Sequence, residues 1–353
     1  MGALVRDGDE TAGTLASWLT TVAGLDRVSV DHVAIPTSTG WSNETVLFDA
    51  WWSHDGDVER HELVARIAPR DYQVFVDQTF SRQFAVMRAL AEHSDVPVPR
   101  TYWYEPDPAW FGSAFWIIER VSGDIPADAP PYAGEGWLKD ARPDQQVQAW
   151  WSGIDAMVGI HSLDIDSIGI PPDTFSPSEG PIEWHLDHYD RFLHWAEDGH
   201  PHALARRALE RLRSEKPPPP ERGATLSWGD ARLSNLIYRD FEVVAVLDWE
   251  MTALGDPLLD LGWWLFADQT LTTGSGCTRL PGFPSAKETE EYWRIRTGRS
   301  TEALDYYILF AGLRFTVIML RMGKLLFDMG VVPSTFAYDN LVSAALQEVL
   351  TTR

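Results

Sequence analysis

Residues 224–265 read ATLSWGDARLSNLIYRDFEVVAVLDWEMTALGDPLLDLGWWL. Two short apolar runs inside this segment, LIY at 236–238 and VVAVL at 243–247, predict a pair of β-strands. The polar residues 239–242 (RDFE) can form the turn between them. The sequence therefore predicts a β-hairpin whose open end faces the two flanking loops.

Three oxygen-bearing side chains flank this hairpin. Asn235 precedes the first strand and Asp248 follows the second, so the hairpin places them side by side at its open end. Asp230 lies five residues before Asn235, in the loop that enters the hairpin. Carboxylate and amide oxygens are the ligands that Mg²⁺ prefers. An aspartate beside such a pair is typical of phosphoryl transfer to a hydroxyl group, in which a base takes the hydroxyl proton.

The chain before residue 122 is rich in β-type patterns. The runs VSVDHVAI, ETVLFDAWW and HELVARIA, separated by turn residues, predict an antiparallel meander. A helix is expected over 75–93, and VPVP at 96–99 ends it because proline cannot continue a helix. Two more strands are expected in RTYWYEP and AFWIIERV. Together with a helix at 10–23, these elements predict a first lobe that spans residues 1–122.

The chain after residue 122 is mainly helical in pattern. The stretch 123–136, rich in proline, alanine and glycine, indicates a lobe boundary, so the second lobe spans residues 123–353. The helices that we expect there lie near 143–163, 184–197, 201–214, 256–269, 286–296, 302–322 and 336–350. The predicted fold class is α+β, with a β-rich lobe followed by a helical lobe.

Composition and charge exclude several classes of function. The 353 residues carry 29 basic and 52 acidic side chains, a net charge of −23 that disfavours nucleic acids and anionic membrane surfaces. The same charge keeps a protein soluble, and it can attract a cationic substrate. A single cysteine, Cys277, excludes a disulfide framework and a thiolate metal cluster. Neither a secretion signal nor a membrane span is apparent, and we expect a cytoplasmic protein. The oligomeric state is not indicated.

Several motifs resemble a known family in the order in which that family carries them. WGDARLSN resembles the HGDxxxxN catalytic loop of aminoglycoside phosphotransferases, and LDWEMTALGDPLLDLGWW resembles their metal segment. TGWSNETVLF looks like the family's phosphate-covering hairpin, and IHSLDIDSIGI like its L-H-x-x-D segment. The resemblance covers roughly residues 30–270 and is closest to the kinase-like domains fused to acyl-CoA dehydrogenases. It implies a two-lobed protein-kinase-like fold.

The resemblance also implies a role for individual residues. Asp230 would be the catalytic base, and Asn235 and Asp248 would bind Mg²⁺. Asp260 would hydrogen-bond the catalytic loop. Nucleotide contacts would come from a phosphate loop, a phosphate-binding cation with its helix partner, and an adenine-binding hinge. These nucleotide-binding residues are Thr39, Gly40, Ser42 and Asn43 in the loop, Arg66 and Gln83 as the pair, and Glu119 to Val121 in the hinge.

Three positions depart from the family pattern. Trp228 replaces the motif histidine, which supports the loop backbone in the family. Arg66 stands where a lysine is usual and can bind phosphate as a bidentate fork. Gln83 replaces the acidic partner of that lysine, so a neutral contact would replace an ion pair.

The sequence thus predicts an enzyme that uses Mg²⁺ and ATP or GTP to phosphorylate a hydroxyl group of a small molecule. Two alternatives remain: a hydroxyacyl-CoA kinase, as the closest subgroup implies, and a nucleotide-binding pseudokinase without turnover. The net charge and the acidic helical segment 183–198 favour a cationic or neutral acceptor. His185, His188 and His194 lie on that helix, where they line the substrate cleft or face solvent.

Overall fold

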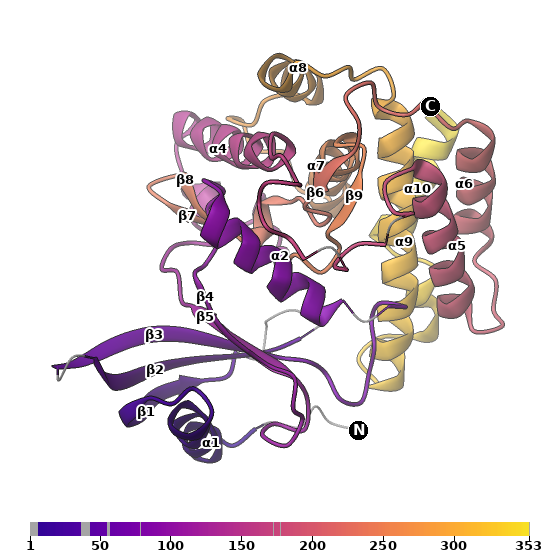
Figure 1. Cartoon of the computed structure of the whole chain (residues 1–353). Helices are drawn as coiled ribbons and strands as arrows, with labels where there is room; N and C mark the ends of the chain where they lie inside the picture. Colours follow the sequence, from indigo (N-terminus) through magenta and orange to yellow (C-terminus); the bar gives the residue numbers. More distant parts are fainter. Residues whose placement is uncertain are drawn as a thin grey trace. The chain divides into compact units, whose positions relative to one another are not determined.

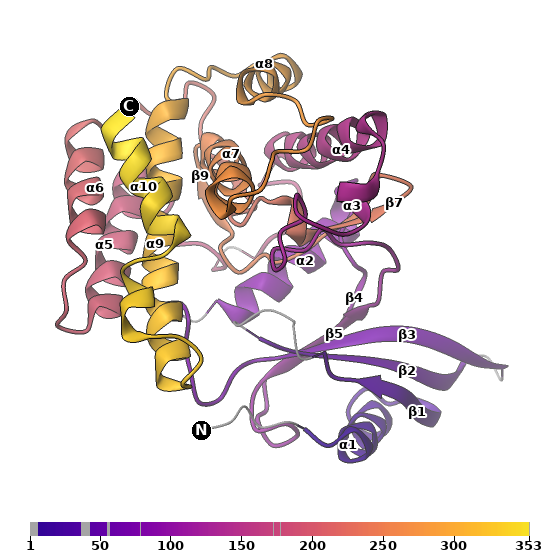
Figure 2. The ribbon, with the colours of Figure 1, turned by 180° about the vertical axis from the view of Figure 1, so that it is seen from behind.

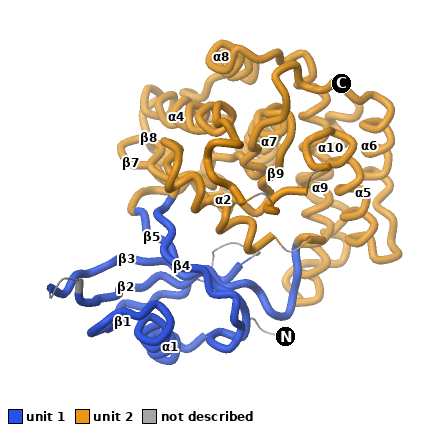
Figure 3. The backbone as a smooth tube through the Cα atoms, viewed as in Figure 1, with its two compact units in different colours: residues 1–74, 99–121 blue, residues 75–98, 122–353 orange. Residues whose placement is uncertain are grey.

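The computed structural model describes residues 6–36, 43–54, 57–77, 79–171, 173–176 and 178–352. Two compact units make up the chain (Figure 3). Unit 1 contains residues 1–74 and 99–121, and unit 2 contains residues 75–98 and 122–353. The predicted lobes were contiguous, whereas residues 75–98 group with unit 2.

Unit 1 is built on one antiparallel sheet (Figure 1). Its strands lie in the order β1-β2-β3-β5-β4, so the expected meander of the first three strands is confirmed. β5 pairs with both β3 and β4 and lies between them. The strands are β1 Asp26–Ala34, β2 Glu44–His54, β3 Asp57–Ile67, β4 Thr101–Glu105 and β5 Phe115–Glu119.

Helix α1 (Gly8–Thr21) packs its apolar side chains against this sheet. Its buried residues Leu15, Trp18 and Leu19 join a core formed by alternate residues of β2 and β3. Alternation places every second strand residue on one face, which matches the burial of Val46, Phe48, Ala50 and Trp52. The indole of Trp18 also donates to a carboxylate oxygen of Glu105 at 2.8 Å.

Unit 2 is mainly helical (Figures 1 and 2). The almost fully buried helix α7 packs along α9, and α5, α6 and α10 also pack against α9. The α-helices are α2 Phe80–His93, α3 Trp137–Asp140, α4 Pro143–His161, α5 Ile182–Glu197, α6 Ala203–Ser214, α7 Leu258–Leu271, α8 Ala286–Thr297, α9 Leu304–Asp328 and α10 Leu341–Thr352. Short 3₁₀ turns cover Leu233–Asn235, Thr273–Ser275 and Ser334–Ala337.

Two helices begin five residues later than the sequence predicts. α2 was expected from residue 75 but begins at Phe80. The hydroxyl of the preceding Thr79 does not cap the helix and instead donates to the carbonyl of Glu250 at 3.0 Å. α10 was expected from residue 336 but begins at Leu341. There the side chain of Asn340 accepts from the next free N–H groups, which is the role of a helix cap.

Two small antiparallel sheets of unit 2 carry the functional segment. β7 (Leu236–Arg239) and β8 (Glu242–Val246) form the predicted hairpin. β6 (Thr225–Ser227) pairs with β9 (Ala253–Gly255), so the chain just before the catalytic loop lies beside the middle of the metal segment. Among the helices of the described ranges, none is long and apolar enough to cross a lipid bilayer.

Candidate active site

The open end of the hairpin brings the predicted metal-binding residues together. The N–H of Leu247 donates to the carbonyl of Asn235 at 2.9 Å, so this pairing continues the hairpin beyond its named strands. Asp248 is therefore one residue from the partner of Asn235. The backbone of Asp248 has a φ of 59°, in the left-handed region, which turns the chain away from the strand.

The carboxylate of Asp230 is buried and held by three donors. Asn235 Nδ2 donates to Oδ2 at 2.7 Å, and Trp263 Nε1 donates to Oδ1 at 2.8 Å. Arg232 Nε lies 3.0 to 3.1 Å from the two oxygens. Asn235 Nδ2 also donates to the backbone carbonyl of Asp230 at 3.0 Å. The carboxylate is thus fixed in orientation beside the hairpin end.

Arg232 lies among three carboxylates. It pairs with Asp230 and also with Asp128. Burial opposes the charge of the guanidinium, but the carboxylates of Asp230, Asp128 and Asp248 outweigh it and raise the pKa of Arg232. One cation beside three carboxylates leaves an excess of negative charge, which favours the approach of a divalent cation.

The residues at the hairpin end fit Mg²⁺ in their chemistry. The amide nitrogen of Asn235 is used by Asp230, so its Oδ1 is the atom left for a cation, and Asp248 contributes a carboxylate. Across the described part of the chain, no group of three or more His, Cys, Asp or Glu side chains could hold a metal ion. Mg²⁺ commonly binds through one or two protein oxygens plus substrate phosphates. Asn235 and Asp248 match that pattern.

Asp260 organises the backbone of the catalytic loop, as the family resemblance implied. Its fully buried carboxylate accepts from Ser227 Oγ at 2.7 Å and from the N–H groups of Trp228 and Gly229, both at 2.8 Å. His161 Nε2 lies 2.9 Å from the same carboxylate. The expected contact between Asp260 and the loop is confirmed.

Trp228 compensates for the missing motif histidine. Its buried indole N–H donates to the carbonyl of Leu247 at 2.7 Å and thereby joins the catalytic loop to the residue before Asp248. The next residue, Gly229, has a φ of 93°, and a Cβ there would lie 2.1 Å from the carbonyl oxygen of Met251. Only glycine fits this crossing of the two segments.

The predicted nucleotide-binding residues lie mostly in unit 1. Thr39, Gly40 and Ser42 lie outside the described residues. Asn43 is buried just before β2. The roles of these four residues in phosphate binding stay predictions.

The other predicted nucleotide contacts are divided between the units. Arg66 on β3 donates to the hydroxyl of Thr45 at 2.9 Å, and Gln83 is buried on α2 of unit 2, so their mutual contact stays a prediction. Glu119 ends β5, and Val121 is the last residue of unit 1. Their role as a hinge for adenine also stays a prediction.

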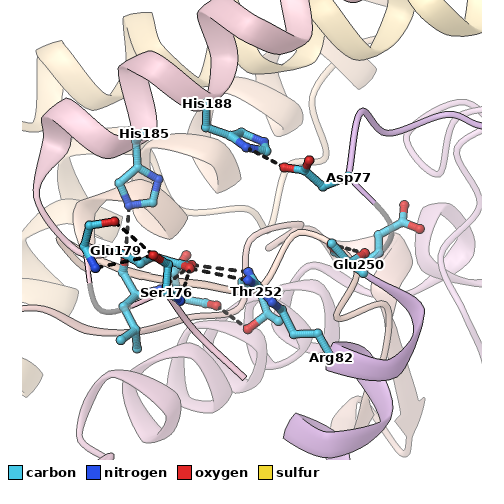
Figure 4. A network of polar contacts seen from close by, with 12 residues as sticks. Asp77, Arg82, Ser176, Glu179, His185, His188, Glu250 and Thr252 are labelled. Carbon is cyan, nitrogen blue, oxygen red and sulfur yellow. Dashed lines mark hydrogen bonds and ion pairs between the residues drawn. The ribbon is translucent and has the colours of Figure 1, made fainter. Parts of the chain in front are cut away.

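Unit 2 contains a small pocket that the sequence did not reveal. It has a cavity of about 50 Å³ and is lined by residues of the segment before α2, of α2 itself, of α5, of α9 and of the chain around β9. Arg82 of α2 holds one wall: its guanidinium contacts the carboxylate of Glu179 at 3.3 and 3.4 Å and the carbonyl of Thr252 at 3.4 Å (Figure 4). Arg82 and Glu179 are 97 residues apart, and no motif links them.

Two histidines of α5 line this pocket as neutral rings. Burial lowers the pKa of His185 to about 3 and that of His188 to about 4. His185 Nε2 contacts the carbonyl of Leu254 at 2.8 Å, and His188 Nδ1 lies 3.3 Å from a carboxylate oxygen of Asp77 (Figure 4). The expectation that these two histidines line a cleft matches their position, whereas His194 is exposed.

The role of Trp228 can be tested against a matched tryptophan. Trp228→Phe should lower the free energy of unfolding by about 1 kcal/mol more than Trp264→Phe, because it also leaves the Leu247 carbonyl without its donor. Trp264 is equally buried, and its Nε1 has no hydrogen-bond partner among the described residues. Urea unfolding of both variants measures the difference. Equal losses would show that the indole hydrogen bond contributes nothing.

The buried His185 should make the protein sensitive to acid. In the unfolded chain the ring takes up a proton below pH 6.5, whereas the folded protein resists this until about pH 3. The free energy of unfolding should therefore fall by about 1.4 kcal/mol per pH unit from this group as the pH decreases through that window. His185→Gln should give a shallower slope in denaturant unfolding between pH 6 and about 4.

The exposed His194 provides the control for that measurement. His194→Gln should leave the wild-type slope in place. A slope in His185→Gln equal to that of the wild type would contradict the assignment of a buried, neutral ring.

Known proteins are similar to this chain in sequence. The model of the phosphotransferase enzyme family matches residues 34–294. The curated relative "Probable acyl-CoA dehydrogenase IBR3" of Arabidopsis thaliana is 28% identical over 231 residues, which are 64% of this chain and 26% of that protein. The chain thus spans about a quarter of the length of that relative. The expected resemblance to the acyl-CoA dehydrogenase fusions is confirmed.

Solved structures agree on the fold. A "putative aminoglycoside phosphotransferase" of Ralstonia eutropha has a TM-score of 0.70 and 22% identity, with 97% of this chain and 98% of that chain covered. The aminoglycoside phosphotransferase APH(4)-Ia, in a ternary complex with AMP-PNP and hygromycin B, has a TM-score of 0.55 and 15% identity over 96% and 98% of the two chains. The predicted kinase-like α+β fold is confirmed, and the chain belongs to the phosphotransferase enzyme family.

Proposed function

We propose that this protein is a Mg²⁺-dependent kinase that transfers the γ-phosphate of ATP to a hydroxyl group of a small molecule. The observation that carries the proposal is the Asp230 carboxylate, which three donors fix beside Asn235 at the open end of the hairpin. A carboxylate held in this way is a general base in the geometry that phosphoryl transfer to an alcohol needs.

Each residue of the site has a defined part in this reaction. The oxygen of the acceptor forms a bond to the γ-phosphorus, the bond from that phosphorus to the bridging oxygen breaks, and ADP leaves. Asp230 takes the hydroxyl proton. Mg²⁺, held by Asn235 and Asp248, would neutralise the charge of the phosphates. Asp260 and Trp228 keep the loop and the metal segment in register.

ATP is the favoured donor. The structural relative APH(4)-Ia holds AMP-PNP, an ATP analogue, in its ternary complex. Asn43, Arg66, Gln83 and the segment Glu119 to Val121 would contact the nucleotide, together with Thr39, Gly40 and Ser42. GTP is the alternative donor, and a direct comparison of the two nucleotides distinguishes them.

A hydroxyacyl-CoA is the second candidate acceptor class. The observation that favours it is the curated relative named as an acyl-CoA dehydrogenase, of which this chain matches about a quarter. A screen of aminoglycosides, hydroxyacyl-CoAs, amino alcohols and sugars, with ADP formation as the readout, separates the two classes. ATP binding without ADP formation from any of them would indicate a pseudokinase.

The base can be tested by removing its charge. Asp230→Asn should keep the fold and nucleotide binding but lower kcat by about 10²–10⁴, the usual contribution of a general base. ADP release measured with a saturating acceptor provides kcat. Asp240→Asn, in the exposed hairpin turn, is the matched control and should keep the wild-type rate. Turnover of Asp230→Asn close to that of the wild type would overturn the assignment.

The metal ligand can be tested without turnover. Mg²⁺ with ATP should raise the melting temperature of the wild type. Asp248→Ala removes the charged metal ligand, so this variant should lose the part of the shift that depends on Mg²⁺. Thermal melts with ATP plus EDTA and with ATP plus Mg²⁺ separate the two contributions. An undiminished Mg²⁺-dependent shift in the variant would show that Asp248 is not a ligand.

A further inference from the structure

A buried arginine lies behind the catalytic loop and pairs with neutral groups alone among the described residues. Arg314 on α9 is 3% exposed, and a guanidinium keeps its charge in proteins. Its hydrogen bonds to the described chain end on the hydroxyl of Tyr189 and on the carbonyls of Leu259 and Gly229. A buried charge without an opposite charge costs free energy. An apolar side chain could pack at this position of α9 without that cost, so the charge calls for another explanation.

One of these bonds fixes the peptide that leads into the proposed base. Arg314 Nη2 donates at 2.8 Å to the carbonyl of Gly229, which belongs to the peptide that joins Gly229 to Asp230. The peptide before it is already held by Asp260, which accepts from the N–H of Gly229. Glycine permits more backbone rotation than any other residue, and Gly229 uses this freedom at a φ of 93°. The bond from Arg314 therefore restricts a rotation that Asp260 alone leaves open.

The same guanidinium reaches the side chain of the base through an indole ring. Arg314 Cζ lies 4.8 Å from the centre of the Trp263 ring. Two other rings are farther away, that of Tyr189 at 5.6 Å and that of Phe310 at 6.0 Å. Trp263 Nε1 donates to Asp230 Oδ1 at 2.8 Å. A cation on the face of the indole is attracted to the ring, and it polarises the N–H toward the carboxylate.

The contacts that would only join helices are the longer ones. α9 packs along α7 and against α5 (Figures 1 and 2). The bond of Arg314 to α7 is 3.5 Å long, to the carbonyl of Leu259, and its bond to α5 is 3.2 Å long, to the hydroxyl of Tyr189. An N–H···O bond is usually close to 2.9 Å long and weakens when stretched. The bond to the catalytic loop is thus the strongest of the three.

We propose that Arg314 is a positioning residue for Asp230. It holds the peptide that precedes the base and the indole that binds the carboxylate of the base, and so it fixes the rotation of that carboxylate. Arg314 itself touches no reacting atom in this role. The inference rests on the proposed kinase function and adds a residue to its machinery.

Removal of the guanidinium should lower kcat and leave the KM for ATP unchanged. The readout is ADP formed from ATP and Mg²⁺ with water as the accepting hydroxyl, so the natural acceptor is not needed. Arg314→Met should lower kcat about 10- to 100-fold, the usual cost of displacing a catalytic group by about 1 Å. Arg314→Lys keeps the charge and a donor and should retain a larger share of kcat. A wild-type kcat in Arg314→Met, or a rise in KM that accounts for the whole loss, overturns the proposal.

Tyr189→Phe is the matched control. This variant removes the bond from Arg314 to α5 but leaves its contacts with Gly229 and Trp263 in place. It should keep the wild-type kcat. A loss as large as that of Arg314→Met would show that Arg314 acts by joining helices, which contradicts the proposed role.

A double-variant cycle tests whether Arg314 acts through the indole. Trp263→Phe keeps an aromatic ring but removes the donor to Asp230. Because both residues act on one carboxylate, the loss of kcat in Arg314→Met/Trp263→Phe should be smaller than the product of the two single losses. Losses that multiply would show that the two residues act independently, and the path through Trp263 would then be wrong.

A spectroscopic measurement separates failure of this inference from failure of the proposed function. In protein labelled with ¹⁵N-tryptophan, the Nε1–H signal of Trp263 is assigned by its loss in Trp263→Phe. This hydrogen should exchange with solvent faster in Arg314→Met than in the wild type, because its bond to Asp230 is weakened. Its exchange rate should stay unchanged in Tyr189→Phe. Arg314→Gln, which is neutral but polar, takes the place of the methionine variant if that variant does not fold.

The two failures give different results. Faster exchange of the Trp263 hydrogen, in a protein whose wild type forms no ADP with water or with any acceptor of the screen, overturns the kinase proposal and leaves the positioning of Asp230 by Arg314 standing. An unchanged exchange rate in the Arg314 variant overturns the positioning role, whatever the turnover.

Discussion

A single buried carboxylate, that of Asp260, holds the candidate active site together. Burial alone would raise its pKa, but the hydrogen bonds from His161, Ser227 and the loop N–H groups outweigh burial and lower it. His161 in turn accepts from the indole of Trp293 at 3.1 Å, which places its ring hydrogen on Nε2, toward Asp260. The Asp260 side chain thus joins α7 directly to α4 and β6, and His161 extends the junction to α8. The orientation of Asp230 depends on that junction because the organised N–H groups immediately precede it.

The parts of the site that could be predicted are those encoded by neighbouring residues. The hairpin follows from two apolar runs around a polar turn, and its length alone places Asn235 near Asp248. The contact of Asp260 with the loop was implied by family resemblance rather than by any local pattern. The strands of unit 1 were recognisable because apolar residues recur at every second position, which indicates the buried face of the sheet.

The parts that could not be predicted depend on partners far away in the chain. Periodicity shows which face of α5 is apolar, but it does not show that His185 lies over Gly255. The pairing of Arg82 with Glu179 has no signal in either segment. The substitution of Trp228 for histidine looked like a loss, yet the indole supplies a donor of its own to Leu247. In each case the tertiary partner decides the role, and the residue type alone leaves several roles open.

The division of the chain into its two units has a consequence for how the protein can be taken apart. The chain passes between the units three times, after residues 74, 98 and 121, so no single cut separates them. Cleavage after residue 121 would leave α2 on the amino-terminal fragment. The hydrogen bonds of Arg82 to Glu179 and to the carbonyl of Thr252 would then join two separate fragments. The same holds for the bond from Val246 N–H to the carbonyl of Pro97. During synthesis, residues well past 250 must leave the ribosome before α2 can contact all of its partners. The helix is therefore made early but packs into its final surroundings late.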